Sequence, residues 1–283
     1  IDYLRDVWYS TSYLLDRKQS MNGCAKKRFE NYKQQPLELV FDKSFTGKLS
    51  QFGLNPDRRT PSGIKAAIIR EKGTNGEREM AYMLYLAGFD VKDVTMTDLV
   101  SGRETLEDIN MVVYCGGFSN SDVLGSAKGW AGTFLFNPKA KAALDNFYAR
   151  QDTLSLGVCN GCQLMMELGL ITPEDKKQGK MLHNDSHKFE SAFLGVTVPM
   201  NRSVMFGSLS GSKLGIWVAH GEGKFSLPYP EDHYNVVLKY SYDEYPGNPN
   251  GSDYSVAGIA SQDGRHLAMM PHLERACFPW ENA

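Results

Sequence analysis

From residue 64 onward, short apolar runs alternate with stretches that place apolar side chains on one helical face. This alternation restricts the fold more than any other feature of the sequence. The apolar runs, which are typical of buried strands, are 64–69, 111–115, 153–158 and 266–270, and residues 91–96 can form a further strand. Helical patterns occupy 76–87, the stretch that begins at Asn137-Pro138, and 160–170. We therefore predict an α/β fold whose sheet is mostly parallel and flavodoxin-like, with helices on both faces.

The rest of the chain predicts three further features. Residues 1–45 carry apolar and aromatic side chains at helical spacing and then become polar, so we expect helices without a strand partner. Residues 46–63 are rich in Gly, Pro, Ser and Thr, which is typical of a linker. Residues 64–283 then form the main domain. Between 189 and 259, short apolar stretches alternate with turns, and this predicts a smaller antiparallel β layer.

Composition narrows the function classes. The 31 Lys and Arg residues against 33 Asp and Glu give a net charge of −2, which offers no basic surplus for nucleic acid. No apolar run approaches the length of a membrane span, and no secretory signal precedes the first helix. Five cysteines in 283 residues are too few for a disulfide framework, so we expect a reducing, cytoplasmic setting. Because the chain does not begin with Met, we expect it to be a piece of a longer protein.

Gly157-Val158-Cys159-Asn160-Gly161 lies between a predicted buried strand and a predicted helix. A nucleophile between two glycines at such a junction is typical of the tight turn that exposes a catalytic side chain. The helix N-terminus would favour a thiolate, and the Asn160 N–H would face a developing oxyanion. A buried structural cysteine is the alternative. Cys159-x-x-Cys162 also fits a redox dithiol or half of a zinc site, although no second ligand pair for zinc is evident.

A cysteine nucleophile needs a base, a group that orients the base, and donors for the oxyanion. His272 and Glu274 follow the last predicted strand and are two residues apart, so in extended backbone both side chains project to the same side. Gly117 and Phe118 follow another buried strand, where glycine lets a backbone N–H turn toward a bound group. An ordinary strand–loop turn is the alternative there. The carboxyl ends of parallel strands are where α/β sheets build sites, so these segments should meet.

The chain resembles the class I, triad-type glutamine amidotransferases, because it carries in this order, on a predicted parallel α/β frame, Gly117, Cys159, His272 and Glu274. The further match is to the glutaminase domains of the large phosphoribosylformylglycinamidine synthases, over about residues 64–280. The segments that carry it are 70–76, Gly116-Gly117-Phe118-Ser119, 122–131, Gly157 to Gln163, His220-Gly221-Glu222-Gly223, 245–252 and 270–275. The sequence departs from the family pattern at Asn120-Ser121, where Tyr-Gly is expected, and at Leu273, where Pro is expected.

The resemblance implies a role for each residue. Cys159 would be the nucleophile, His272 the base and Glu274 its orienting partner. The Asn160 N–H and that of Gly117 or Phe118 would stabilise the oxyanion. Gln163 and His220, which fall in the same motifs, would lie near the substrate, although a turn after a strand explains His220 as well.

The resemblance also implies partners. L-glutamine would be the substrate, and its ammonia would pass to a synthetase region of the same parent polypeptide, of which residues 1–45 would be the tail. No cofactor or metal is expected in this chain, which has no P-loop, and ATP and Mg²⁺ would belong to that synthetase region. Two other functions remain open. One is a cysteine-dependent redox or peptidase-like protein on the same frame, and the other is a non-catalytic docking domain.

Overall fold

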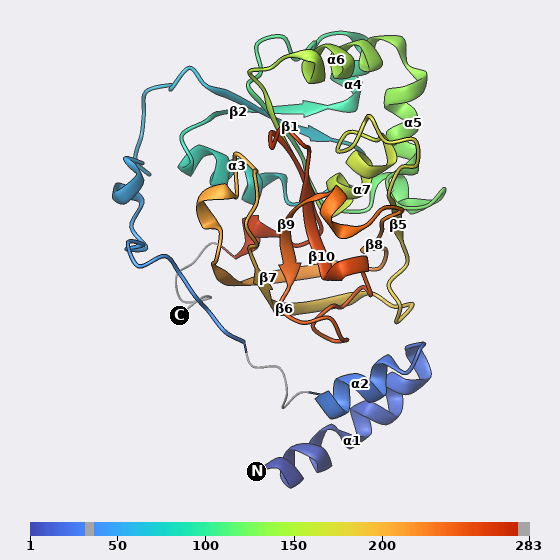
Figure 1. The fold of residues 1–283 in the computed structure, drawn as a ribbon. Coiled ribbons are helices and arrows are strands. Elements are labelled where there is room, and N and C mark those ends of the chain that lie inside the picture. Colours follow the sequence, from blue (N-terminus) through green and yellow to red (C-terminus); the bar gives the residue numbers. More distant parts are fainter. Residues whose placement is uncertain (32–36, 277–283) are drawn as a thin grey trace.

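The computed structural model describes residues 1–31 and 37–276, and within them nine strands form the main sheet (Figure 1). The strand order is β2-β1-β3-β4-β11-β10-β9-β6-β7. The first five strands in that order run parallel and are β2 (Asp90–Thr95), β1 (Lys65–Arg70), β3 (Met111–Tyr114), β4 (Leu154–Val158) and β11 (His266–Met269). Each was predicted as a strand, and the parallel arrangement confirms the predicted fold class.

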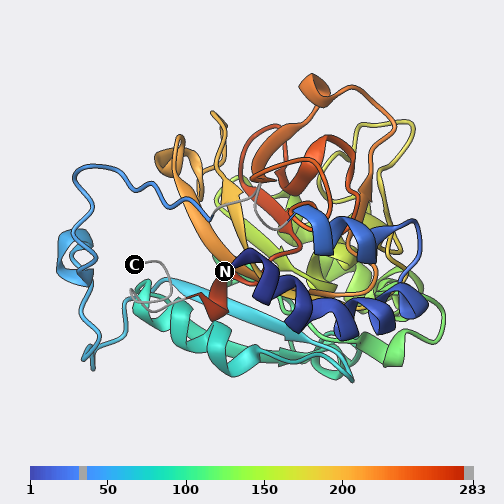
Figure 2. The same cartoon turned by 90° about the horizontal axis from the view of Figure 1, so that it is seen from below.

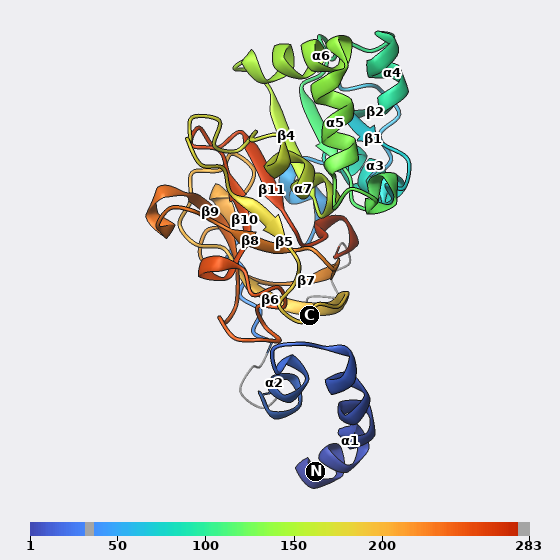
Figure 3. The ribbon, with the colours of Figure 1, turned by 90° about the vertical axis from the view of Figure 1, so that its right-hand side faces the viewer.

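The helices that follow these strands lie on both faces of the sheet (Figure 3). They are α3 (Glu77–Leu86), α4 (Met96–Ser101), α5 (Lys128–Phe136), α6 (Pro138–Ala149) and α7 (Asn160–Glu167). Helix α3 packs on β1 and β2, whereas α5 packs against both α6 and α7 on the opposite face. The Asn137 side chain caps α6 by accepting hydrogen bonds from the first turn, as its Asn-Pro start predicts. Helix α7 ends at Glu167, three residues before the predicted end.

The antiparallel strands continue the main sheet beyond β11. They are β10 (Val256–Ala260), β9 (Asn235–Tyr240), β6 (Glu190–Thr197) and β7 (Lys213–His220). A separate two-stranded antiparallel sheet consists of β5 (Lys180–Leu182) and β8 (Lys224–Ser226). The 3₁₀ helices are η2 (Leu49–Phe52), η3 (Ser119–Asp122), η4 (Gly207–Leu209), η5 (Glu231–His233), η6 (Asp253–Ser255) and η7 (Leu273–Arg275).

Two helices precede the sheet, α1 (Asp2–Gln19) and α2 (Cys24–Asn31). They pack on each other, with the rings of Tyr13 and Phe29 stacked 4.7 Å apart. They lie beside the antiparallel end of the sheet, away from α4 and α6 (Figures 1 and 2). Helix α1 buries none of its residues. None of the described helices is long and apolar enough to cross a bilayer.

Candidate active site

Cys159 lies in the turn between β4 and α7 and has a strained backbone, with φ 53° and ψ −106°. Two glycines make the turn possible. A Cβ on Gly157 would lie 2.5 Å from Gly161 O, and one on Gly161 would lie 2.0 Å from Tyr114 O in β3. Neither distance is tolerable, so both positions require glycine. The turn therefore places the Cys159 side chain at the carboxyl edge of the parallel strands and at the N-terminus of α7.

His272 and Glu274 form a buried pair directly after β11. Their side chains are each 2% exposed, and His272 Nδ1 is 2.6 Å from Glu274 Oε1. A Cβ on Gly116 would lie 2.8 Å from His272 Cε1 and 3.4 Å from Cys159 Cβ, so the imidazole and the cysteine meet over this glycine. Burial alone would lower the pKa of His272. Interactions with Cys159 and Glu274 outweigh it and raise the pKa to about 9.

Three buried histidines should therefore titrate very differently. At neutral pH we expect His272 to be protonated, with a pKa of about 9. Burial lowers the pKa of His220 to about 3 and that of His266 to about 4, so both should be neutral. NMR of protein with ¹³C-labelled histidine, assigned with His272→Gln, measures all three.

The Cys159→Ala variant is the control for this titration. Because the interaction with Cys159 helps to raise the pKa of His272, its removal should move the midpoint downward and leave His266 unchanged. A His272 midpoint near 6.5 in the unmodified protein would contradict the proposed pairing.

The loop after β3 packs against the loop after β1. Gly117 has φ 121°, and a Cβ there would lie 2.6 Å from Gly73 O. Phe118 N–H donates to Gly73 O at 2.8 Å, and Asn75 N–H donates to Gly116 O at 2.8 Å. The Phe118 N–H is therefore already engaged. No acceptor is recorded among the described residues for the Gly117 N–H, so of the two predicted donors this one can turn to a ligand.

Asn160 joins that loop through its side chain to the turn that holds Cys159. Asn160 Oδ1 accepts from Ser119 N–H at 3.0 Å, and Asn160 Nδ2 donates to Gln163 Oε1 at 2.9 Å. Gln163 Nε2 in turn donates to Glu222 O at 2.7 Å. Both amide side chains are buried and their polar atoms are used within the protein. Gln163 thus fixes neighbouring backbone, while the Asn160 N–H opens α7 beside Cys159.

His220 is the last residue of β7 and is 2% exposed. Neither ring nitrogen has a hydrogen-bond partner within the described part of the chain. Its backbone oxygen accepts from Asn184 Nδ2 at 2.7 Å. Its ring does not line the cavity described next.

A cavity of about 200 Å³ opens onto Cys159. Cys159, His272, Gly117 and Phe118, which the sequence singles out, line it. The other lining residues are Asn75, Gly76, Glu79, Phe189, Ala219 and Arg275. Sequence reasoning did not select these as site residues. Arg275 directly follows the His–Glu pair, and Asn75 and Gly76 lie in the loop after β1, so three of the six fall in segments that the sequence analysis names.

Cys162, the second thiol of the Cys-x-x-Cys motif, is fully buried on α7. Burial raises the pKa of its thiol well above the usual range. It is therefore a packing residue here, and it shares no disulfide with Cys159. Across residues 1–31 and 37–276, no three His, Cys, Asp or Glu side chains gather as a set of metal ligands.

Comparisons with known proteins agree on one family. A model of CobB/CobQ-like glutamine amidotransferase domains matches residues 63–283. Phosphoribosylformylglycinamidine synthases from Homo sapiens and Drosophila melanogaster are each 40% identical to this chain, over 98% and 96% of its length. The chain spans only about a fifth of either relative, 22% and 21%.

A solved structure of PurLQS from Thermotoga maritima superposes with a TM-score of 0.62 at 28% identity, covering 77% of this chain and 91% of the other. This structural similarity supports the α/β fold independently of the sequence patterns. With a family model that matches most of its length, the chain belongs to the CobB/CobQ-like glutamine amidotransferase domain family.

Proposed function

We propose that this chain hydrolyses L-glutamine to glutamate and ammonia through a thioester on Cys159. One observation carries the proposal most directly: Cys159, held in a strained turn at a helix N-terminus, meets the buried His272–Glu274 pair across Gly116. A thiol, an imidazole that carries its proton, and a carboxylate that orients the imidazole are the groups that acyl transfer requires.

In the proposed reaction, His272 holds the proton of the Cys159 thiol, and the thiolate adds to the amide carbon of glutamine. The backbone N–H groups of Asn160 and Gly117 stabilise the oxyanion, and the loss of one such donor typically costs about 10²–10³ in rate. As the carbon–nitrogen bond breaks, His272 gives its proton to the leaving ammonia. Water, activated by His272, then adds to the thioester, and glutamate and the thiol are released.

The cavity also suits the other end of the substrate. Arg275 and Glu79 line it with opposite charges, which match the α-carboxylate and α-ammonium groups of an amino acid. Its volume of about 200 Å³ suits a ligand of that size. This complementarity favours free glutamine over a peptide.

We propose further that the ammonia serves the synthesis of formylglycinamidine ribonucleotide from formylglycinamide ribonucleotide, a step of purine synthesis. The names of the long relatives support this substrate. The synthetase region would use ATP and Mg²⁺. In this chain, residues 1–45 would be the tail of that region, 46–63 the linker and 64–283 the glutamine amidotransferase domain. A cytoplasmic location stays a prediction.

Labelling with 6-diazo-5-oxo-norleucine, an electrophilic glutamine mimic, tests this proposal. We expect one adduct per chain, on Cys159, as measured by intact mass and peptide mapping. Millimolar glutamine should protect against it. If Cys159 reacts with iodoacetamide but not with the mimic, the proposal fails and a redox or peptidase-like function is favoured. If Cys159 reacts with neither reagent, the result favours the non-catalytic docking function.

A further inference from the structure

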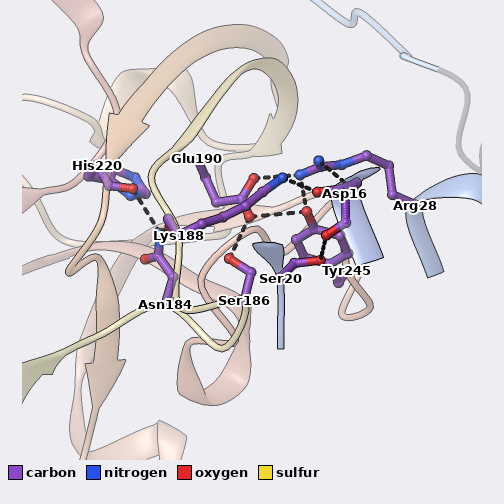
Figure 4. Close-up of polar contacts among 9 residues, drawn as sticks. All are labelled: Asp16, Ser20, Arg28, Asn184, Ser186, Lys188, Glu190, His220 and Tyr245. Atoms are coloured by element: carbon purple, nitrogen blue, oxygen red, sulfur yellow. Dashed lines mark hydrogen bonds and ion pairs between the residues drawn. The ribbon is translucent and has the colours of Figure 1, made fainter. Parts of the chain in front are cut away.

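Residues 184–190, which we call the coupling turn, lie between the α1–α2 helix pair and His220, the last residue of β7 (Figure 4). We propose that Asn184 and Glu190 in this turn are positioning residues, through which the placement of α1 and α2 sets the geometry around Cys159. The proposal rests on the proposed glutamine hydrolysis and extends it to the control of that reaction. It follows from a series of hydrogen bonds, joined by short stretches of backbone, that links α2 to the turn that holds Cys159.

Glu190 joins the coupling turn to α2. Its carboxylate is buried, and Arg28 Nη2 in α2 donates to Oε2 at 2.6 Å. Tyr245 OH donates to the other oxygen at 3.0 Å, and Arg28 also contacts this hydroxyl and bonds Asp16 of α1 at 3.1 Å. If α2 moved away, the Glu190 carboxylate would lose its only cation and keep only the hydroxyl groups of Ser186 and Tyr245 as partners among the described residues. The turn therefore cannot keep the same arrangement when Arg28 leaves.

Backbone contacts strengthen this attachment. Met21 N–H, between α1 and α2, donates to Ser186 O at 2.9 Å. Asn22 Nδ2 donates to Asp185 O at 2.7 Å. Lys188 forms an ion pair with Asp16 of α1. The coupling turn is thus bonded to both helices and to the connection between them.

Asn184 joins the other side of the coupling turn to His220–Gly223. This side chain is completely buried. Its Nδ2 donates to His220 O at 2.7 Å and to Lys188 O at 3.1 Å, and its Oδ1 accepts from Gly223 N–H at 3.0 Å. Its backbone N–H donates to Gly221 O at 2.9 Å. One side chain thereby fixes both ends of the turn that follows β7.

That turn continues directly into the active site. Ala219, the residue before it, has its backbone oxygen 3.7 Å from Cys159 Sγ. Glu222 O accepts from Gln163, which is bonded to the Asn160 side chain. A shift of the turn would move an oxygen that faces the nucleophile and loosen the side chain that holds the loop after β3. The two proposed oxyanion donors, the N–H groups of Gly117 and Asn160, belong to the two segments that the Asn160 side chain joins.

The experiment compares Arg28→Ala, Glu190→Gln and the double variant in the full 283-residue chain. We expect Arg28→Ala to lower the second-order rate of Cys159 modification by 6-diazo-5-oxo-norleucine about tenfold, a typical allosteric coupling. Alkylation of Cys159 by iodoacetamide, which needs no oxyanion site, should change less than twofold. The double variant should be no slower than the slower single variant, because both substitutions break one contact.

Lys26→Ala is the matched control, since it removes an exposed ion pair with Glu30 on the same helix. It should label at the rate of the unmodified chain. Equal rates for the mimic in Arg28→Ala, Glu190→Gln and the unmodified chain would overturn the inference, even if the variants were less stable. An unmodified chain that reacts with iodoacetamide and not with the mimic would instead overturn the proposed function itself.

Discussion

Cys159→Ala is expected to abolish glutamate release from glutamine. Removal of a nucleophile from a triad typically lowers kcat by about 10⁶-fold, because the remaining members cannot act without it. The fold should survive, since alanine is smaller and the strain at φ 53° belongs to the turn rather than to sulfur. The measurement is a coupled assay of glutamate at saturating glutamine, with circular dichroism to verify the fold.

Cys162→Ala is the matched control for this substitution. It also removes a thiol, only three residues further along the chain, but this thiol is fully buried on α7. We expect activity within a fewfold of the unmodified chain and a loss of stability from the small cavity. If Cys162→Ala abolished glutamate release as completely as Cys159→Ala, a dithiol mechanism would replace the proposed one.

The parallel half of the sheet was predictable because strands buried on both faces leave an unbroken apolar signal. Residues 111–114 are such a run and form β3, whereas residues 154–158 form β4 although Ser155 interrupts the apolar pattern. Two helices were not predicted. Helix α5 (Lys128–Phe136) is apolar on most sides and shows no helical period. Helix α4 is short, and its signal lies in the capping box of Thr95 and Asp98 rather than in its apolar spacing.

The candidate site was predictable where a residue type and its place in the fold both carry chemistry. Cys159 and His272 each follow a parallel strand, and the structure brings them together. Gln163 and His220 come from the same motifs, yet neither lines the cavity. Phe189 could not be foreseen, because it lies just before β6, in a segment far in sequence from the parallel strands that carry the other site residues. Its neighbour across the cavity mouth, Phe118, lies 71 positions earlier and 6.0 Å away between ring centroids.

The loop after β3 illustrates a further limit of sequence reasoning. Asn120 and Ser121, at which the sequence departs from the family pattern, both have positive φ, 53° and 56°. Asn tolerates this conformation better than other residues with a side chain, whereas Ser gains nothing from it. Only the loop's contacts with the loop after β1 and with Asn160 account for its shape. Those contacts are distant in sequence and leave no local pattern.

Gly161→Ala should be the most destabilising of the conservative substitutions available near the site. In an ordinary helix this change is favourable by about 1 kcal/mol, because alanine has the higher helix propensity. Here the new Cβ would lie 2.0 Å from Tyr114 O and 2.6 Å from its carbonyl carbon, and both atoms belong to the backbone of a central strand. Neither can yield without moving α7 away from β3. We therefore expect the free energy of unfolding in urea to fall by about 2–3 kcal/mol.

Gly132→Ala, in α5, separates this contact from a general effect of the substitution. Its Cβ would meet only the flexible Phe136 side chain at 3.8 Å, so stability should rise or stay constant. The two variants should thus change stability in opposite directions, although both replace a helical glycine by alanine. Gly161→Ala should also slow labelling of Cys159 by the glutamine mimic, because α7 carries the Asn160 N–H that faces the oxyanion. Equal stability of the two variants would mean that α7 can shift on the sheet without a loss of stability. Close packing of α7 against β3 would then not be what holds Cys159 in its strained turn.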